Sequence, residues 1–382
     1  MNTFTGSPLS PPDRLLCGPG PSNVGRNVLD AMHQPMLGHL DPDFHDILLE
    51  VVALQRQVYR APDGLVFPLQ STGTAGMEAG IASLVAPGEK VIVGQCGFFG
   101  RRIAEIARRY GAEVIAVDAD WGEVVPEAEL LAALDQHPDT RLLAVVHGET
   151  STGVQHPVEA LAQKLAGRET LLMVDCVTTL GGVPFEFGAW GVDFAYSCTQ
   201  KCVGAPPGMS PIAVSERALE HMRSRPNQLP YSLDLDLLEG YWVQRPVVYH
   251  HTAPILHIYA LHEALRSALE EGLEARWTRH ADAGAHLQQG LRSRGLELLA
   301  DPDHQLAPLT AVRIPEGLDG KAVQTRMLRE HGIEIGGGLG PAAPPMWRIG
   351  LMGTNATVAV ADRVLEALDA VLAEERVLAP AP

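Results

Sequence analysis

The chain has 382 residues, of which 46% are hydrophobic, and a formal net charge of −17 at pH 7. This length and composition are typical of a globular protein with two domains. The acidic balance disfavours nucleic acid and anionic membranes as partners, and no apolar run approaches the length of a membrane span.

The N-terminus is polar and proline-rich and lacks the apolar core of a secretory signal. We expect residues 1–13 to form a flexible arm that precedes the first regular elements. From about residue 65, short β-branched runs alternate with segments of helical spacing. The predicted strands are 65–70, 90–94, 112–117, 141–146, 170–174, 193–196 and 211–214. The predicted helices are 75–85, 101–110, 127–134 and 158–165.

This alternation predicts an α/β fold with a mainly parallel central sheet covered by helices. Ligands of such sheets bind at the carboxyl ends of the strands. Residues 71–74, Ser151 and Asp175 each follow a predicted strand. We therefore expect these three segments to meet in one crevice.

The second half of the chain has a different pattern. Residues 256–294 are helical in spacing, and then strands at 309–314 and 347–352 flank a helix at 321–330. This predicts a smaller C-terminal α+β domain and a frayed tail after Arg376. The expected organisation is an N-terminal arm over 1–21, a large domain over 22–270 and a small domain over 271–382.

The five cysteines are odd in number and scattered. This favours small buried residues in a reducing compartment over a disulfide framework, so we expect a cytoplasmic protein.

Residues 70–76, QSTGTAG, join a predicted strand to a predicted helix. Free backbone N–H groups at a helix start, helped by hydroxyls, form an anion site. Neither GxxxxGK[ST] nor a helix-opening GxGxxG is present, so the usual nucleotide fingerprints are absent. A phosphate site and a simply capped helix both stay open.

Three charged residues are further candidates. Asp175 follows an apolar strand, where a carboxylate needs a partner such as a cationic heterocycle, or else caps a turn. Lys201 follows a strand-like segment and is either a desolvated amine nucleophile or a surface lysine. Arg348 lies inside an apolar strand, where a guanidinium binds a carboxylate or forms a structural ion pair.

Residues 249–252, YHHT, form a dense polar cluster. Adjacent histidines point in different directions and no HExxH occurs, so we expect hydrogen bonding there and no metal site.

Together these motifs resemble the class V, fold-type I aminotransferases, most closely the alanine–glyoxylate and serine–pyruvate group. The resemblance runs from residue 15 to about residue 370. The most specific motifs are LLCGPGPS at 15–22, HGETSTG at 147–153, QK at 200–201, PPG at 206–208, YHHT at 249–252 and RIG at 348–350.

The resemblance implies pyridoxal 5′-phosphate as the cofactor. It implies Lys201 as the catalytic lysine that bonds to the cofactor aldehyde and shuttles a proton, and Asp175 as the partner of the ring nitrogen. The implied cofactor-binding residues are Thr72, Gly73, Thr74, Phe99, Ser151, Asp175, Gln200, Lys201, Tyr249 and Thr252. The implied substrate-binding residues are Arg348, Ser151 and Gly20.

Two positions depart from the family pattern. Phe99 stands where the animal enzymes often carry a stacking tryptophan, and Thr74 stands where some relatives carry histidine. An aromatic face survives the first change, and a backbone N–H survives the second. Tyr249 and Thr252 would reach the phosphate of a neighbouring subunit, which implies a homodimer.

The implied reaction is ping-pong transfer of an amino group from alanine or serine to glyoxylate or pyruvate. Small partners are expected because the loop at 18–21 and Arg348 offer no second cationic site for a dicarboxylate. The first alternative is a ureidoglycine–glyoxylate aminotransferase, whose relatives carry asparagine where this chain has Tyr249.

Other functions fit less well. A cysteine desulfurase needs a cysteine in the C-terminal part, and none follows Cys202. A nicotinamide-dependent oxidoreductase needs a glycine fingerprint that is missing, and a non-catalytic binding protein would not need Lys201, Asp175 and Arg348 together.

Overall fold

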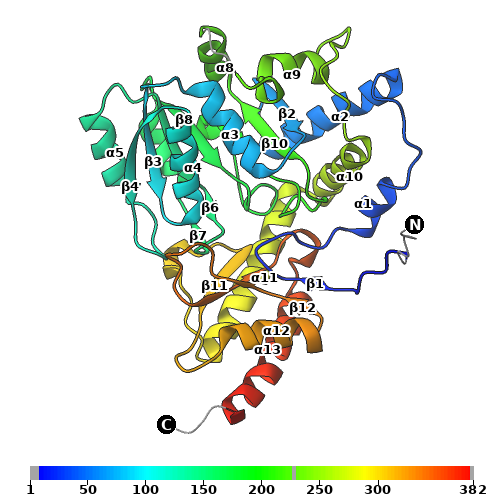
Figure 1. Cartoon of the computed structure of the whole chain (residues 1–382), viewed down its shortest axis with the longest axis vertical. Coiled ribbons are helices and arrows are strands. Elements are labelled where there is room, and N and C mark those ends of the chain that lie inside the picture. The colour runs from blue at the N-terminus through cyan, green and yellow to red at the C-terminus, as the bar shows by residue number, and fades with distance from the viewer. Residues whose placement is uncertain (1–7, 226–228, 379–382) are drawn as a thin grey trace, which may run out of the picture.

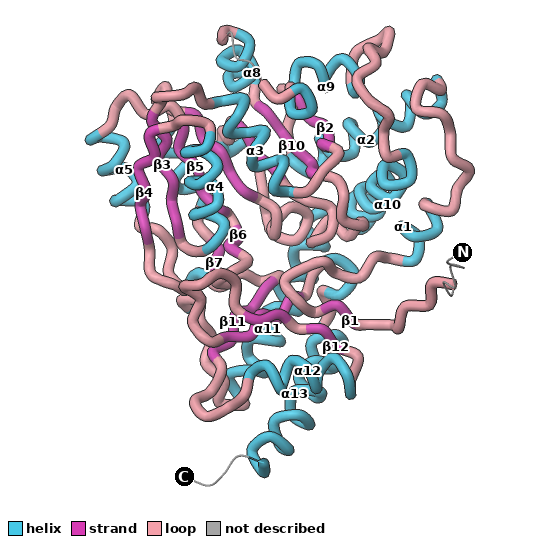
Figure 2. The backbone as a smooth tube through the Cα atoms, in the orientation of Figure 1, coloured by secondary structure: helices cyan, strands magenta, loops and turns pink. Residues whose placement is uncertain are grey.

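The computed structural model describes residues 8–225 and 229–378 and has an α/β fold (Figure 1). Its strands form two main groups, a large sheet above and a smaller one below, with loops gathered between them (Figure 2). This arrangement places the ends of many strands near one another.

The large sheet has seven strands in the order β2 (Leu65–Leu69), β10 (Ser210–Val214), β9 (Phe194–Tyr196), β8 (Leu171–Asp175), β5 (Leu142–Val146), β3 (Lys90–Gln95) and β4 (Glu113–Asp118). All neighbours are parallel except β10, which runs antiparallel to β2 and β9. Strands β2, β5, β8, β9 and β10 are buried throughout, which explains their continuous apolar runs. The predicted mainly parallel sheet is confirmed.

Helices cover this sheet, and the four predicted ones are present, three with shifted ends and the one over 158–165 with the predicted ends. They are α3 (Gly73–Leu84), α4 (Phe98–Arg109), α5 (Glu127–Gln136) and α6 (Val158–Leu165), joined by α7 (Phe187–Trp190) and α8 (Glu216–Arg223). Helix α3 begins at Gly73 rather than at Ala75. The turn expected to bind an anion is therefore the first turn of the helix itself.

Several elements were not predicted, namely α1 (Arg26–Ala31), α2 (Pro42–Tyr59), α9 (Leu235–Trp242) and the hairpin of β6 (Gly148–Glu149) and β7 (Val154–Gln155). The signals for α2 were in the sequence. Asp41 caps its start by accepting from the Asp43 N–H, Pro42 occupies the first turn, and Arg60 ends it in the left-handed conformation. Helix α2 packs against β2 and against α10 (Ile255–Glu271).

The helical stretch predicted over 256–294 is two helices, because Gly272 adopts a φ of 86° between α10 and α11 (Leu273–Ser293). Beyond it, β11 (Leu309–Arg313), β14 (Met346–Gly350) and β13 (Gly336–Gly337) form an antiparallel sheet. The remaining helices are α12 (Gly320–Glu330) and α13 (Val358–Leu378), and short 3₁₀ turns occur at Tyr231–Leu233, Pro302–His304 and Gly353–Asn355. A second apolar core, which includes Trp347 and Leu368, joins these elements.

The N-terminal segment belongs to this second core. Strand β1 (Leu15–Leu16) pairs in parallel with β12 (Ile333–Glu334), and Cys17 is fully buried beside them. The arm expected over residues 1–13 and the tail expected after Arg376 lie partly outside the described residues. The division into domains at residues 21 and 270 stays a prediction.

Within the described residues, no helix combines the length and apolar character needed to cross a membrane. All five cysteines are buried and none forms a disulfide.

Candidate active site

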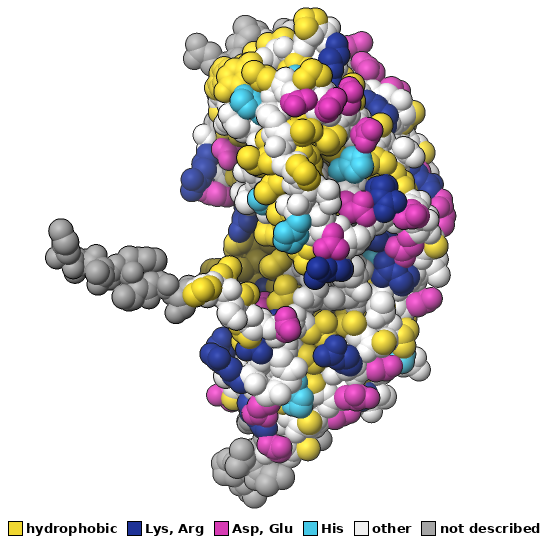
Figure 3. Space-filling view, turned by 90° about the vertical axis from the view of Figure 1, so that its right-hand side faces the viewer, with side chains coloured by type: hydrophobic (Ala, Val, Ile, Leu, Met, Phe, Trp, Pro, Cys, Tyr) yellow, Lys and Arg dark blue, Asp and Glu magenta, His cyan; other side chains and the backbone are white. Residues whose placement is uncertain are grey.

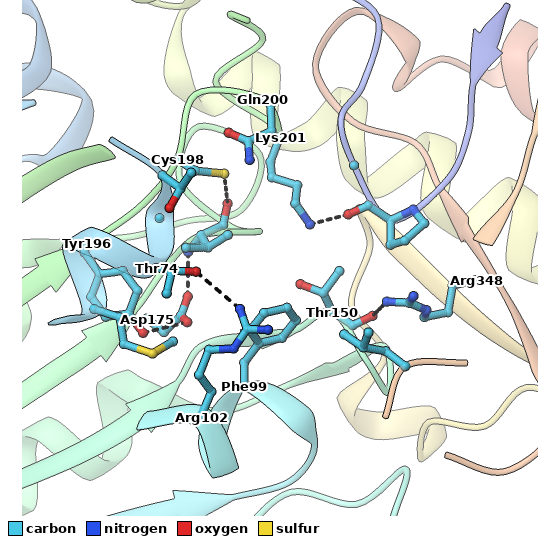
Figure 4. A pocket seen from close by; sticks show the side chains of 17 residues that line it. Thr74, Phe99, Arg102, Thr150, Asp175, Tyr196, Cys198, Gln200, Lys201 and Arg348 are labelled. Atoms are coloured by element: carbon cyan, nitrogen blue, oxygen red, sulfur yellow. Dashed lines mark hydrogen bonds between the residues drawn. The ribbon is translucent and has the colours of Figure 1, made fainter. Parts of the chain in front are cut away.

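A cavity of about 330 Å³ lies at the carboxyl ends of the central strands (Figure 4). Nine of the residues singled out in the sequence line it, namely Gly20, Thr72, Gly73, Thr74, Phe99, Asp175, Gln200, Lys201 and Arg348. Pro19, Met77, Arg102, Thr150, Val177, Tyr196, Cys198 and Leu339 complete the lining. The expected crevice therefore exists, and residues from distant segments meet in it.

Lys201 is one of four lysines in the chain and the one that lines this cavity. It follows β9, is 7% exposed, and its Nζ donates to the Pro19 carbonyl oxygen. Burial lowers the pKa of this amine, which favours the neutral, nucleophilic form. Gly20 has a φ of 108°, and a Cβ there would lie 2.6 Å from Lys201 Cδ, so a glycine is needed for this close approach.

Asp175 is the last residue of β8 and is 2% exposed. Its Oδ2 accepts a hydrogen bond of 2.7 Å from the Tyr196 hydroxyl, and its Oδ1 accepts one of 2.9 Å from the Val177 N–H. Burial raises its pKa to about 6. No described cation forms an ion pair with this carboxylate, so a cationic ligand group would suit the place.

The N-terminus of α3 forms another wall. Thr72 precedes the helix without a side-chain cap, and the first N–H groups of a helix have no partner within it. A Cβ at Gly73 would lie 3.1 Å from Val177 Cγ2 and 3.3 Å from Cys198 Cβ, so the glycine allows the backbone to approach. Nearby, Gln200 lines the cavity, and its amide nitrogen is a hydrogen-bond donor. This wall offers donors to an anion.

Arg348 approaches the cavity from β14 and is 6% exposed. Its Nε donates to the Gly337 carbonyl at 2.6 Å and its Nη1 to the Thr150 carbonyl at 3.2 Å. Burial lowers its pKa to about 10, so the side chain stays cationic at neutral pH. No described carboxylate forms an ion pair with it, which leaves N–H groups for a planar anion.

Ser151, expected in the crevice, does not line it. Its fully buried hydroxyl donates to Glu149 Oε1 at 2.6 Å and accepts from the Phe98 N–H at 2.8 Å. The preceding Thr150 lines the cavity instead. Since successive side chains point in different directions, Thr150 faces the cavity while Ser151 faces Glu149, and the role expected for Ser151 stays a prediction.

Glu149 organises this corner of the site. Its buried carboxylate accepts from the N–H groups of Phe99 at 3.0 Å, Gly100 at 3.3 Å and Ser151 at 3.0 Å. Burial raises its pKa, and these hydrogen bonds oppose the increase. The start of α4, and with it the Phe99 ring, is thereby held against the cavity.

Tyr249 and Thr252 are exposed and lie outside this cavity. Between them, the Nδ1 atoms of His250 and His251 are 2.6 Å apart, and His251 also contacts Gln70. Hydrogen bonding thus accounts for the two histidines. Among the described residues, no group of three or more His, Cys, Asp or Glu side chains could hold a metal ion.

Tyr196 was not singled out in the sequence, although a signal was present. It ends β9 directly beside the end of β8, and the two strands pair Asp175 with Tyr196. A hydroxyl at that register position is well placed to donate to the buried carboxylate.

The pattern of the aminotransferase class-V family matches residues 18–359. The chain belongs to the class V aminotransferases. It is 36% identical over 367 residues to an alanine–glyoxylate aminotransferase of Drosophila melanogaster, covering 95% of this chain and 93% of the relative. It is also 36% identical to an (S)-ureidoglycine–glyoxylate transaminase of Bacillus subtilis over 384 residues, covering 95% and 92%.

A solved structure extends this comparison to the fold. The crystal structure of an alanine–glyoxylate aminotransferase from Nostoc sp. is similar to this aminotransferase with a TM-score of 0.93 and 46% identity, covering 97% of this chain and 98% of that chain. The fold-type I architecture expected from the resemblance is confirmed.

The cofactor of this aminotransferase is pyridoxal 5′-phosphate, and the cavity fits it. Asp175 lacks a cation, the Gln200 side chain lines the cavity, and the α3 N-terminus offers free N–H groups. Asp175 would hold the ring nitrogen, Lys201 the aldehyde carbon, and residues 72–74 with Gln200 the phosphate. When bound, the cofactor supplies an aldehyde that bonds to amines and a ring that withdraws electrons.

The protein's own groups do the rest. Asp175 would keep a proton on the facing nitrogen, because a buried carboxylate stabilises a neighbouring cation. Lys201 Nζ, whose pKa is lowered by burial, would accept the proton from the α-carbon of the amino donor and return it. Arg348 would orient the donor by binding its carboxylate, so that this proton would face the lysine.

The Asp175→Asn variant separates function from stability. The folded protein keeps Asp175 protonated up to about pH 6, whereas the unfolded chain releases that proton near pH 3.8. The ionised carboxylate therefore lowers the stability of the cofactor-free protein as pH rises through this window. Above pH 6 we expect the variant to gain up to about 3 kcal/mol in free energy of unfolding, and to bind cofactor about 10²-fold more weakly.

Denaturation of the cofactor-free protein at pH 5 and pH 8, with an absorbance titration of cofactor, measures both effects. The exposed Asp282→Asn variant on α11 is the control and should change neither. A variant that loses stability at pH 8, or binds cofactor normally, would contradict the assignment.

Proposed function

We propose that this aminotransferase transfers the amino group of alanine or serine to glyoxylate or pyruvate. The observation that carries the proposal is the guanidinium of Arg348, buried without a carboxylate partner in a cavity of about 330 Å³ that the cofactor must share. A small amino acid fills the remaining space and supplies the missing carboxylate. The Drosophila and Bacillus subtilis relatives support glyoxylate as the acceptor, because both are named as glyoxylate aminotransferases.

Ureidoglycine is the alternative donor. The chain is 36% identical to both the Bacillus subtilis and the Drosophila relative, so these two relatives do not separate the two functions. Tyr249, where ureidoglycine transaminases tend to carry asparagine, favours alanine or serine.

The half-reaction of each donor with the loaded enzyme tests the proposal. Alanine or serine should convert the bound cofactor with a kcat/KM about 10²-fold above those of ureidoglycine and glutamate, and glyoxylate should then restore the starting spectrum. Stopped-flow absorbance measures both steps. Faster conversion by ureidoglycine would select the alternative function.

The Arg348→Gln variant is the internal control for this panel. It should lower kcat/KM for alanine about 10²-fold while ethylamine, which lacks a carboxylate, reacts as with the unaltered enzyme. An equal loss with both amines would mean that Arg348 has only a structural role.

We also propose that the enzyme is a homodimer with shared active sites. Large hydrophobic side chains are exposed at Met36 (69%), Leu40 (54%), Tyr231 (64%), Val248 (54%) and Tyr249 (56%). The His39–Tyr249 ring contact and the stacked Tyr231 and His250 rings link these segments into one region. Exposed apolar regions of this kind are typical of interfaces.

The side of the molecule that carries α1, α2 and α10 shows the same feature. Hydrophobic side chains gather among charged ones in its upper half and line a hollow beside the N-terminal segment (Figure 3). Thr72 and Thr74 are exposed at the rim of the cofactor cavity, which leaves room for Tyr249 and Thr252 of a second subunit to complete it.

Mixing two defective variants tests this arrangement. Lys201→Ala removes the lysine of one site, and a Tyr249→Ala, Thr252→Ala double variant removes the groups donated to the other. Co-expressed subunits should regain about a quarter of the unaltered activity at limiting cofactor, because half of the dimers then contain one intact site. Sedimentation measures the assembly, and a monomer or an absence of complementation would reject the proposal.

A further inference from the structure

Arg102 is a cavity residue to which the resemblance assigns no role. It lies on α4 three positions after Phe99, so the two side chains share one face of the helix. Its Nη1 donates to Thr74 Oγ1 at 3.3 Å. Its Cζ lies 4.8 Å from the Phe98 ring centroid and 5.0 Å from that of Phe99. The guanidinium thus joins the start of α3 to the expected stacking ring (Figure 4).

The charge of Arg102 is not neutralised by the protein around it. Within residues 8–225 and 229–378, no carboxylate forms an ion pair with its guanidinium. Arg102 also differs from its neighbour Arg101 in position, since Arg102 lines the cofactor cavity and Arg101 does not. A cation held in this way is available to an anionic ligand.

The cavity has two arginines with separate partners. Arg348 enters from β14 and is tied to the Gly337 and Thr150 carbonyls, whereas Arg102 enters from α4 and contacts Thr74. The sequence offered no second cationic site, and the structure supplies one. Its contact with Thr74 places it beside the α3 N-terminus rather than beside Arg348.

The anion at the α3 N-terminus needs such a charge. Thr72, Gly73, Thr74 and Gln200 provide only neutral donors, while a phosphate monoester carries a charge of about −1.5 to −2 at neutral pH. A poorly compensated dianion in a partly buried cavity is costly. A guanidinium matches phosphate oxygens in geometry as well as in charge.

We propose that Arg102 binds the cofactor phosphate together with the α3 N-terminus, and so sets the affinity of the enzyme for the phosphorylated cofactor. Its contacts with the Phe98 and Phe99 rings hold the guanidinium at this end of the cavity. The proposal rests on the assignment of the phosphate to residues 72–74, and it makes no use of the substrate.

Binding to the cofactor-free protein tests the proposal without turnover. The Arg102→Gln variant should bind pyridoxal 5′-phosphate and inorganic phosphate about 10- to 100-fold more weakly, while its affinity for unphosphorylated pyridoxal stays unchanged. Arg102→Lys should recover part of the loss, because it restores the charge but not the planar fork. Arg101→Gln, one position away on the same helix, is the matched control and should bind all three ligands normally.

Equal weakening of pyridoxal and pyridoxal 5′-phosphate would overturn the proposal and place the effect in the Phe99 ring. Unchanged cofactor affinity with a selective loss of kcat/KM for glutamate would overturn it as well, and would make Arg102 a determinant of dicarboxylate substrates. Either outcome leaves the transaminase assignment intact.

Discussion

The buried carboxylate of Asp175 is the interaction on which the rest of the site depends. A carboxylate at the end of an apolar strand loses the hydration it has in water, and this loss is costly unless other groups replace it. Tyr196 and Val177 supply two hydrogen bonds, yet its pKa remains raised to about 6. The protein alone therefore leaves the carboxylate incompletely stabilised, and a cationic ring nitrogen would complete its environment.

A second buried carboxylate, Glu149, shows how different surroundings give the same chemical group a different role. Glu149 accepts hydrogen bonds from three backbone N–H groups and from the Ser151 hydroxyl, so the protein satisfies it without a ligand. It fixes the start of α4 and so positions both Phe99 and Arg102. Asp175 has fewer protein donors and faces the cavity. The number of donors around each acid thus separates the structural carboxylate from the functional one.

The central sheet and most of the residues that line the cavity could be predicted from the sequence. Short apolar runs that alternate with helical segments indicate strands, and ligands of parallel sheets bind where the strands end. Three features were beyond that reasoning or were overlooked. The pairing of Leu15 with Ile333 joins residues too distant for any local pattern to reveal. Thr150 and Ser151 are equally plausible in a motif, and only the fold decides which side chain faces the cavity. Arg102 could have been found, since it lies on the same helix face as Phe99.

The most direct test asks which lysine carries the cofactor. Borohydride reduction of the loaded enzyme fixes the cofactor to the amine that holds it, and digestion with mass spectrometry then locates the added mass among the four lysines of the chain. We expect modification of Lys201 alone, and neither bound-cofactor absorbance nor turnover in Lys201→Ala. Modification of Lys90, Lys164 or Lys321 instead, or full activity of Lys201→Ala, would contradict it.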